Sequence, residues 1–177
     1  VPTPCPTDDH LPTVALGLRL HLHARQREHR RMIETTMDRW HAFLRGEVDL
    51  DDVLHEDCVF WSPVLFRPQE GRELTKLYLT AAYQVFPGDQ DDDASGDGTD
   101  PAGGSSAFRY TRRILDGNHA ALEFETTMDG VAVNGVDLIT CDAEGLIVEF
   151  KVMLRPRRAV EKVQEQMAAM LEALSDD

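Results

Sequence analysis

The sequence predicts an α+β domain in which a cone-shaped, curled antiparallel sheet is covered by N-terminal helices and followed by an added C-terminal helix. Four strand-like runs between residues 107 and 154 are joined by three turns that contain Asp and Gly. Two segments with the apolar periodicity of helices precede these runs, and a third follows Pro156. Helices that come before a long antiparallel sheet are typical of an α+β fold, whereas alternating strands and helices would indicate a parallel sheet.

The N-terminal part of the chain divides into an extension and a first helix. Residues 1–27 are rich in Pro and Thr and then in Arg and His, so we expect a disordered or loosely helical extension before a domain that spans residues 28–174. Within residues 28–46, apolar side chains recur at helical spacing, and Gly46 is a suitable end for the helix. The predicted apolar face consists of Ile33, Met37, Trp40 and Leu44.

Three shorter elements follow. Residues 49–57 predict a short second helix with acidic residues in its first turn. Residues 58–68 are rich in β-forming residues, and Pro63 divides them into a short β pair. Residues 70–86 predict another helix. Its expected apolar stripe consists of Leu74, Leu77, Tyr78, Ala81, Ala82 and Val85.

An acidic segment separates the helices from the main strands. Residues 88–106 contain no apolar residue larger than Ala, so we expect a disordered loop. Its aspartates have a spacing similar to that of an EF-hand calcium loop. However, Ala94 stands where that loop needs glycine, and no helix follows. We therefore interpret the segment as a solvated loop and expect no metal site.

The clearest pattern is the set of four strand-like runs, which cover residues 107–115, 119–128, 131–141 and 146–154. Short hairpins make neighbouring strands antiparallel, so these runs predict a four-strand meander that the short β pair extends. In the second run, Glu123 and Glu125 alternate with apolar residues and are expected to point away from the core. After the meander, residues 157–174 predict a helix with one apolar face.

Charge and cysteine content exclude several classes of partner. The formal net charge of the 177 residues is −14, and an acidic protein repels both phosphate backbones and anionic lipid. We therefore expect no nucleic acid and no membrane among its partners. The three cysteines form neither a disulfide framework nor a zinc pattern, and no apolar run has the length of a membrane span. These features favour a cytoplasmic protein without a cofactor.

A curled sheet covered by helices leaves a cavity between the two layers, and such cavities are common ligand sites. Asp137 lies between Val136 and Leu138 on the third run, where strand alternation places it on the same face as Ile139. Burial on that face would raise the pKa of Asp137 and favour a neutral acid. Two interpretations stay open: a group that faces a ligand, or a structural acid bonded to Trp40, to His41 or to a backbone amide.

Two stretches and their order along the chain resemble a known superfamily. "GEVDLDDVLHEDCVFWSP" and "GVDLITCDAEGLIVEFKV" are similar to segments of the nuclear transport factor 2-like superfamily, which includes SnoaL-like polyketide cyclases and ketosteroid isomerases. The resemblance covers about residues 30–155 without the acidic loop. It implies a cone-shaped fold and homodimers that pair through their exposed sheets. This fold hosts enzymes, binding proteins and assembly modules, so function has to be argued from the site.

The comparison with ketosteroid isomerases can be made residue by residue. In that family a tyrosine of the first helix and a protonated aspartic acid bind the substrate oxygen, and a second aspartate moves the proton. Asp137 matches the protonated acid, whereas Trp40 stands at the tyrosine position and Ser62 at the position of the base. Tryptophan only donates hydrogen bonds and serine is not a base at neutral pH, so this mechanism is disfavoured.

These observations lead to two functional hypotheses. The first is a small-molecule-binding, SnoaL-like protein with an apolar pocket and one buried acid, extending to an isomerase, cyclase or hydrolase that acts on a hydrophobic cyclic compound. The alternative is a non-catalytic dimeric interaction or scaffold module whose cone is filled by its own side chains. A cavity on the order of a few hundred Å³ would favour the first hypothesis.

The expected partners are a hydrophobic small molecule and a second copy of the chain. Asp137 is the candidate catalytic residue. His41 and His55 are interpreted as surface or capping residues, because both lie near predicted helix ends. The residues expected to contact the ligand are Trp40, Ser62, Tyr78, Asp137 and Leu154.

Overall fold

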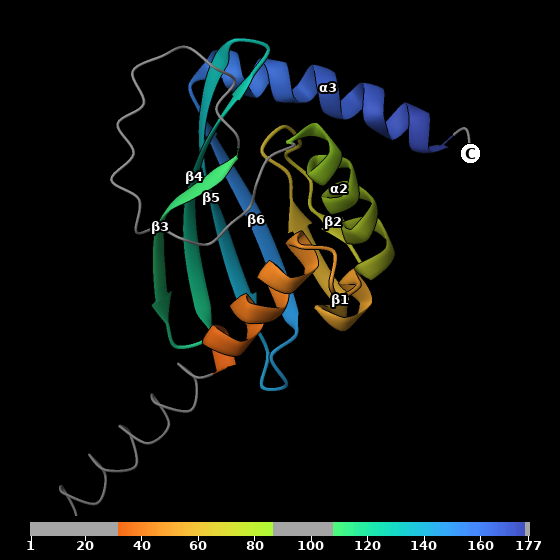
Figure 1. Ribbon diagram of the computed structural model, residues 1–177. Helices are drawn as coiled ribbons and strands as arrows, with labels where there is room; N and C mark the ends of the chain where they lie inside the picture. The colour runs from red at the N-terminus through yellow and green to blue at the C-terminus, as the bar shows by residue number, and fades with distance from the viewer. Residues whose placement is uncertain (1–31, 87–107, 176–177) are drawn as a thin grey trace, which may run out of the picture.

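The computed structural model describes residues 32–86 and 108–175. The expectations for the N-terminal extension, and for the acidic segment with its rejected calcium site, lie outside these residues. Among the described residues, no helix has both the length and the apolar character needed to span a membrane. The protein is α+β, with a curled, unclosed sheet that carries helices on its concave face (Figure 1).

The sheet has six strands in the order β2-β1-β6-β5-β4-β3. The predicted meander is present, and each of its strands begins and ends within two residues of the expected positions. The turns between its strands contain glycines with positive φ, namely Gly117, Gly130 and Gly145. The strands of the meander are β3 (Arg109–Asp116), β4 (His119–Met128), β5 (Val131–Cys141) and β6 (Ile147–Arg155).

The sheet is mixed rather than wholly antiparallel. Strand β1 (Leu54–Trp61) pairs with β6 in parallel and with β2 (Gln69–Glu70) in antiparallel orientation. Hairpins dictate the direction only of strands that are consecutive in the chain, and no hairpin joins β1 to β6. The expectation of an antiparallel sheet was therefore correct for the meander and for β1 with β2, but wrong for the pair that connects them.

Two elements between the first helix and the helix Arg72–Val85 differ from the prediction. The expected second helix at residues 49–57 is only a single 3-10 turn, η1 (Leu50–Asp52), and β1 begins two residues later. The Asp49 carboxylate accepts a hydrogen bond from the backbone N–H of Asp51, which completes a turn of this length. From Leu54 the chain is a strand with Leu54, Cys58 and Phe60 buried, and the second strand of the β pair starts only after Pro68.

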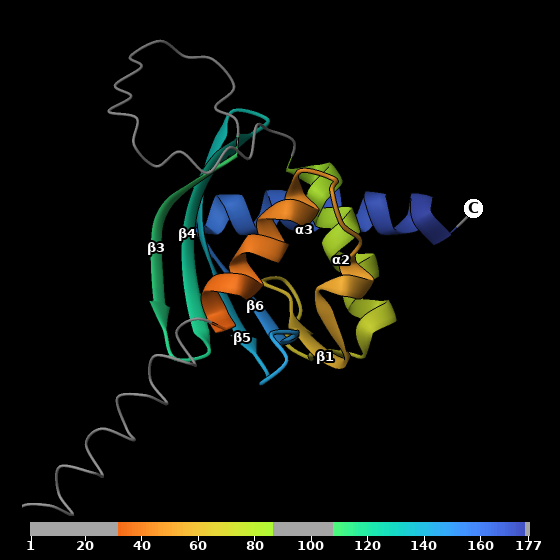
Figure 2. The ribbon, with the colours of Figure 1, turned by 60° about the horizontal axis from the view of Figure 1, so that its bottom comes forward.

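Two helices lie against the concave face of the sheet (Figure 2). The first helix is described over residues 32–44, and its predicted apolar face is buried. The Thr36 hydroxyl lies 3.0 Å from the carbonyl oxygen of Gly145, which ties this helix to the turn between β5 and β6. The second is α2 (Arg72–Val85). Its buried stripe includes Thr75 and Leu79, whereas Leu74, expected on that stripe, is exposed.

The C-terminal helix α3 (Arg157–Ser175) lies across one end of the sheet and reaches α2 (Figure 1). It has its own core, in which Ala159, Val163 and Met167 pack with Phe124 and Val133. The first helix and α2 share a separate core with the centre of the sheet. The region between these two cores contains the cavity described below.

The convex face of the sheet carries no helix in the described part of the chain (Figure 2). As expected, Glu123 and Glu125 point to this face, where they pair with Arg112 at 3.5 Å and Arg109 at 3.2 Å. Three large apolar residues on β3, β5 and β6 are also exposed there, namely Ile114, Leu138 and Met153. This face therefore combines an apolar stripe with charges of both signs.

Candidate functional site

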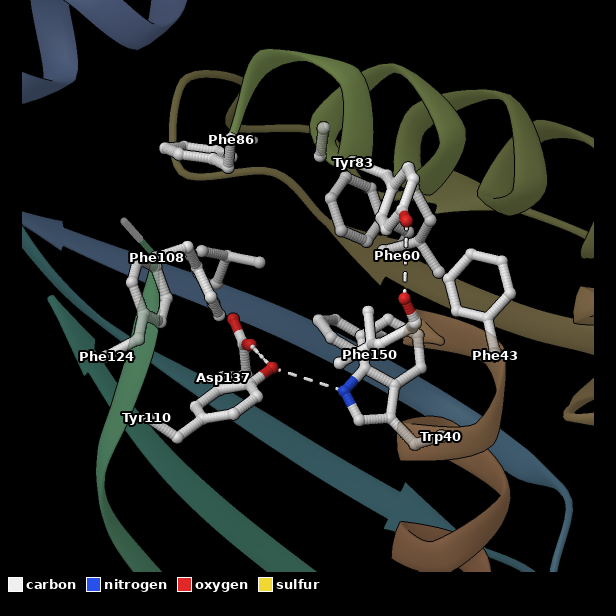
Figure 3. Close-up of a pocket in the computed structure, with 14 residues that line it drawn as sticks. Trp40, Phe43, Phe60, Tyr83, Phe86, Phe108, Tyr110, Phe124, Asp137 and Phe150 are labelled. Carbon is white, nitrogen blue, oxygen red and sulfur yellow. Dashed lines mark hydrogen bonds between the residues drawn. The ribbon is translucent and has the colours of Figure 1, made fainter. Parts of the chain in front are cut away.

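A cavity of about 70 Å³ lies between the first helix, α2 and the concave face of the sheet (Figure 3). Aromatic rings form most of its wall. The polar side chains among its lining residues are those of Trp40, Tyr83, Tyr110 and Asp137. The complete lining is Trp40, Phe43, Leu44, Phe60, Leu79, Ala82, Tyr83, Phe86, Phe108, Tyr110, Phe124, Asp137, Phe150 and Val152.

Asp137 is the buried carboxylic acid of the described chain, with 5 % of its surface exposed. It lies in the middle of β5, opposite Leu122 on β4 and Val152 on β6, and strand alternation turns it toward the cavity. Burial raises the pKa of the Asp137 carboxyl from 3.8 to about 7, and the hydrogen bond from Tyr110 only partly opposes this shift. At neutral pH the group is therefore balanced between its neutral and its ionised form.

A chain of two hydrogen bonds connects the first helix to Asp137. The Tyr110 hydroxyl donates to Oδ2 of Asp137 at 2.9 Å and accepts from Nε1 of Trp40 at 3.2 Å. Figure 3 shows the three side chains in a row along one wall, with phenylalanine rings around them. Tyr110 thus lies between Trp40 and Asp137, whose direct bond was one of the alternatives left open for a structural acid.

A bulge in β3 places Tyr110 inside the cone. Tyr110 pairs with Phe124, but the next residue pair is Arg112 with Glu123, so Thr111 is an extra residue in the strand. Beyond the bulge, Leu115 faces inward and Ile114 is exposed. A regular strand with Leu115 inward would turn position 110 to the outer surface, because side chains alternate with a period of two.

The remaining wall is built from packed rings. The indole of Trp40 lies 4.9 Å from the ring of Phe150, and the rings of Phe108 and Phe124 stack at 4.9 Å between centroids. The Tyr83 hydroxyl donates to the carbonyl oxygen of Leu44 at 3.3 Å, so its proton is bonded to the backbone. The polar atoms that face the cavity are therefore concentrated at Asp137 and Tyr110.

Solved structures with this architecture identify the fold. A steroid delta-isomerase from Pseudomonas aeruginosa superposes with a TM-score of 0.67, at 27% identity over 82% of this chain and 96% of that chain. A bacterial protein with a cystatin-like fold from Silicibacter pomeroyi is 30% identical over 68% of this chain and 72% of that chain, with a TM-score of 0.55. The chain belongs to the nuclear transport factor 2-like superfamily.

A third neighbour, a nuclear transport factor 2-like protein from Mesorhizobium loti, shares the fold at 20% identity, with a TM-score of 0.53 over 71% of this chain and 93% of that chain. The sequence matches no family model and no curated protein. The solved structures that this protein resembles support an isomerase-type fold. The chemistry has to be argued from the residues of this protein itself.

Two of the ligand-contact residues predicted from the superfamily resemblance and the sequence, Trp40 and Asp137, line the cavity together. The other three lie elsewhere. Ser62 is buried at the end of β1, where its hydroxyl accepts from the backbone N–H of Val64 at 3.3 Å. Tyr78 is half-buried against Phe60, and Leu154 packs with the α3 core.

The two histidines, both expected to be surface or capping residues, differ in their environments. His41 is 4 % exposed on the first helix, and its ring lies 6.0 Å from the ring of Tyr110, so the expectation of a surface or capping residue was wrong. His55 lies in β1 rather than beside a helix end, and its Nδ1 accepts from the backbone N–H of Asp57. Neither side chain lines the cavity.

Sequence reasoning missed Tyr110 and the two residues nearest the acidic segment, Phe86 and Phe108. Both phenylalanines line the cavity, and their rings lie 6.3 Å apart. The alternation of Phe108 and Tyr110 at the start of β3 was an available signal. Within the described residues, no group of three or more His, Cys, Asp or Glu side chains could hold a metal ion.

Proposed function

We propose that the protein binds a small hydrophobic molecule through one oxygen atom, with Asp137 as the hydrogen-bonding group. One observation carries this proposal: a carboxyl group that is 5 % exposed lies in a cavity lined mainly by aromatic and aliphatic side chains. The hydrogen bond from Tyr110 occupies only Oδ2 of this acid, and a perturbed acid in a cleft is more often functional than an acid elsewhere.

The protonation state of Asp137 determines what such a ligand can be. The neutral acid donates a hydrogen bond to a carbonyl oxygen, whereas the ionised acid only accepts one. A carboxyl group with a pKa of about 7 also exchanges protons readily at neutral pH. The site is therefore suited to proton transfer of the isomerase, cyclase or hydrolase type. Among the described lining residues, however, the other ionisable side chains are Tyr83 and Tyr110, so Asp137 would be both acid and base.

The size of the cavity limits the ligand. A volume of about 70 Å³ is smaller than the roughly 300–1,000 Å³ of typical ligand sites. We therefore propose a small ligand, or a larger one of which only the flat, oxygen-bearing end enters between the rings. The likeness to a steroid delta-isomerase supports a cyclic ligand, while Trp40 and Ser62 at the two other family positions argue against that enzyme's mechanism.

A matched pair of probes tests the proposal. Cyclopentanone and methylenecyclopentane have nearly the same shape, but only the ketone accepts a hydrogen bond. At pH 6 we expect the ketone to bind about five- to tenfold more tightly, which corresponds to one hydrogen bond, as measured by NMR titration. Asp137→Ala should remove this difference, and Asp137→Asn, whose amide still donates, should keep it at every pH. Equal binding of the two probes to the wild type would refute the proposed role of Asp137.

A second candidate function is the non-catalytic dimeric module, which the small cavity and the convex face of the sheet favour. The exposed apolar stripe of Ile114, Leu138 and Met153 has charges of both signs beside it, so two copies can pair despite the net charge of −14. In this alternative the ring-lined cone is simply a core. Failure of both probes to bind, together with a stable dimer, would favour it over ligand binding.

A further inference from the structure

We propose that Trp40 is a positioning residue that sets the direction of the hydrogen-bond chain, so that Oδ1 of Asp137 becomes the donor to a ligand oxygen. The donation to a ligand rests on the proposed function, but the hydrogen-bond chain from Trp40 to Asp137 is present without a ligand. Figure 3 shows its order: indole, phenol, carboxyl. One group in this hydrogen-bond chain has a role that cannot change.

That group is the indole of Trp40. Its Nε1–H donates and cannot accept, so the Tyr110 oxygen must be the acceptor of the 3.2 Å contact. The proton of the Tyr110 hydroxyl cannot point back toward Trp40. Of these two neighbours, only Asp137 can receive it, and Oδ2 lies at 2.9 Å. Between these two contacts, Trp40 therefore leaves Oδ2 of Asp137 as the acceptor of the tyrosine proton.

The consequence falls on the other carboxyl oxygen. When Asp137 is neutral and Oδ2 accepts from Tyr110, the acid proton belongs on Oδ1, the oxygen that is not bonded to Tyr110. A ligand carbonyl oxygen then receives its hydrogen bond from Asp137 and not from Tyr110. The opposite arrangement, in which Asp137 donates to Tyr110 and Tyr110 donates to the ligand, would make the tyrosine the ligand's donor.

The packing of Trp40 keeps the chain aligned. The indole is 4 % exposed and is held between the rings of Phe43 at 5.4 Å and Phe150 at 4.9 Å. Phenylalanine at position 40 can keep this ring packing while it removes the donor. The other tryptophan, Trp61, lies at the end of β1 beneath the ammonium of Lys151 and does not line the cavity. It provides a matched control for every measurement on Trp40.

Few ionisable side chains of the described structure lie near the hydrogen-bond chain of Trp40, Tyr110 and Asp137. In the described structure, α2 contributes Tyr83 to the cavity, and the first helix places His41 6.0 Å from Tyr110, while β4 and β6 contribute Phe124, Phe150 and Val152. Among these described residues, Asp137 and His41 are the groups besides the tyrosines whose titration would affect the Trp40 resonance. The variant Asp137→Asn separates them, because it leaves His41 in place.

The first test needs no ligand. Because hydrogen bonds in a chain polarise one another, ionisation of Asp137 should move the indole N–H resonance of Trp40 downfield as the pH rises through about 7. We expect this titration to vanish in Asp137→Asn and in Tyr110→Phe, while the resonance of Trp61 stays constant in all three proteins. An indole resonance that does not titrate, or that titrates unchanged in Tyr110→Phe, would overturn the inference even if ligands bind.

The second test uses the matched probes at pH 6. The preference for cyclopentanone over methylenecyclopentane should fall by up to about fivefold in Trp40→Phe, because Asp137 can then donate to Tyr110 and leave a ligand oxygen at Oδ1 without its donor, and it should be unchanged in Trp61→Phe. It should survive in Tyr110→Phe, because Asp137 remains the donor. Loss of the preference in Tyr110→Phe would instead make Tyr110 the donor and overturn the inference, while leaving the proposed binding intact. If neither probe binds, the proposed function fails. The ligand-free titration then tests by itself whether Trp40 sets the direction of the hydrogen bonds.

Discussion

The ring of Phe124 occupies the space in which a side chain at Gly135 would stand. A Cβ atom built on Gly135 would lie 2.3 Å from Cζ of Phe124 and 2.7 Å from Cδ2 of Leu154. The two residues are direct neighbours on β4 and β5, and Phe124 is also part of the cavity wall. The missing side chain at position 135 therefore lets the wall of the cavity lie flat on the sheet.

Gly135→Ala should destabilise the protein by about 1–3 kcal/mol, because the added methyl group overpacks this contact. Phe124→Leu shortens the side chain and gives the methyl group room. We expect the double variant to be less destabilised than the sum of the two single variants, as measured by urea unfolding. Strict additivity would show that the two residues do not compete for this space.

Asp137 should make the free energy of unfolding depend on pH in an unusual direction. The folded protein keeps a proton on this acid up to about pH 7, whereas the unfolded chain releases it near pH 4. The contribution of Asp137 to the free energy of unfolding therefore falls as the pH rises from about 4 to about 7, and it stays constant above that range. Other carboxylates contribute in the opposite direction, so the measurement has to isolate this group.

Asp137→Asn provides that comparison, since it removes the titrating group and changes its size little. Relative to this variant, the wild type should lose on the order of 1 kcal/mol of stability per pH unit between pH 5 and pH 7. Urea unfolding at several pH values measures the difference. Parallel curves for the two proteins would mean that the folded and unfolded states hold the Asp137 proton equally well.

The two buried cysteines should be inert in the folded protein. Burial raises the pKa of Cys58 to about 11 and also raises the pKa of Cys141, and neither side chain is accessible. The thiolate is the reactive form, so both thiols should react with a disulfide reagent at pH 8 only when the chain unfolds. A Cys5→Ser background leaves these two as the thiols to count, and complete labelling in urea is the control. Rapid labelling without urea would contradict the buried positions.

The convex face of the sheet should determine the oligomeric state, if the chain pairs with a second copy. Leu138→Glu places a charge in the exposed apolar stripe and should shift a dimer to a monomer in sedimentation experiments. Leu74→Glu on α2 is a matched control, since Leu74 is 37% exposed and Leu138 is 38% exposed. A dimer that persists in Leu138→Glu would require a different interface.

The sequence was sufficient for the architecture because its strongest signals are local. The Asp/Gly turns define the meander, and the spacing of Ile33, Met37 and Trp40 predicts the buried face of the first helix. The position of Asp137 inside the cone followed from strand alternation alone. Residues 49–57 were misinterpreted because acidic residues before an apolar pair suit a helix start as well as the single turn that is present.

The site was harder to predict because its geometry depends on tertiary contacts. Tyr110 faces inward only because Thr111 is an extra residue, and a bulge of this kind has no fixed sequence signature. Ser62, Tyr78 and Leu154 have suitable residue types on suitable elements, but the packing of β1 and α3 takes them away from the cavity. The small volume of the cavity depends on how the rings interlock, which periodicity does not reveal.

The extra residue in β3 also affects how this chain should be compared with its relatives. An alignment to a protein whose corresponding strand is regular requires a one-residue gap at Thr111. Without the gap, the two halves of the strand cannot both be in phase, and either Tyr110 or Leu115 is matched to an outward-facing position. Where Tyr110 is the misaligned residue, a homology model would lack the phenol beside Asp137, and a search that scores the pocket residues by column would miss proteins of the same kind.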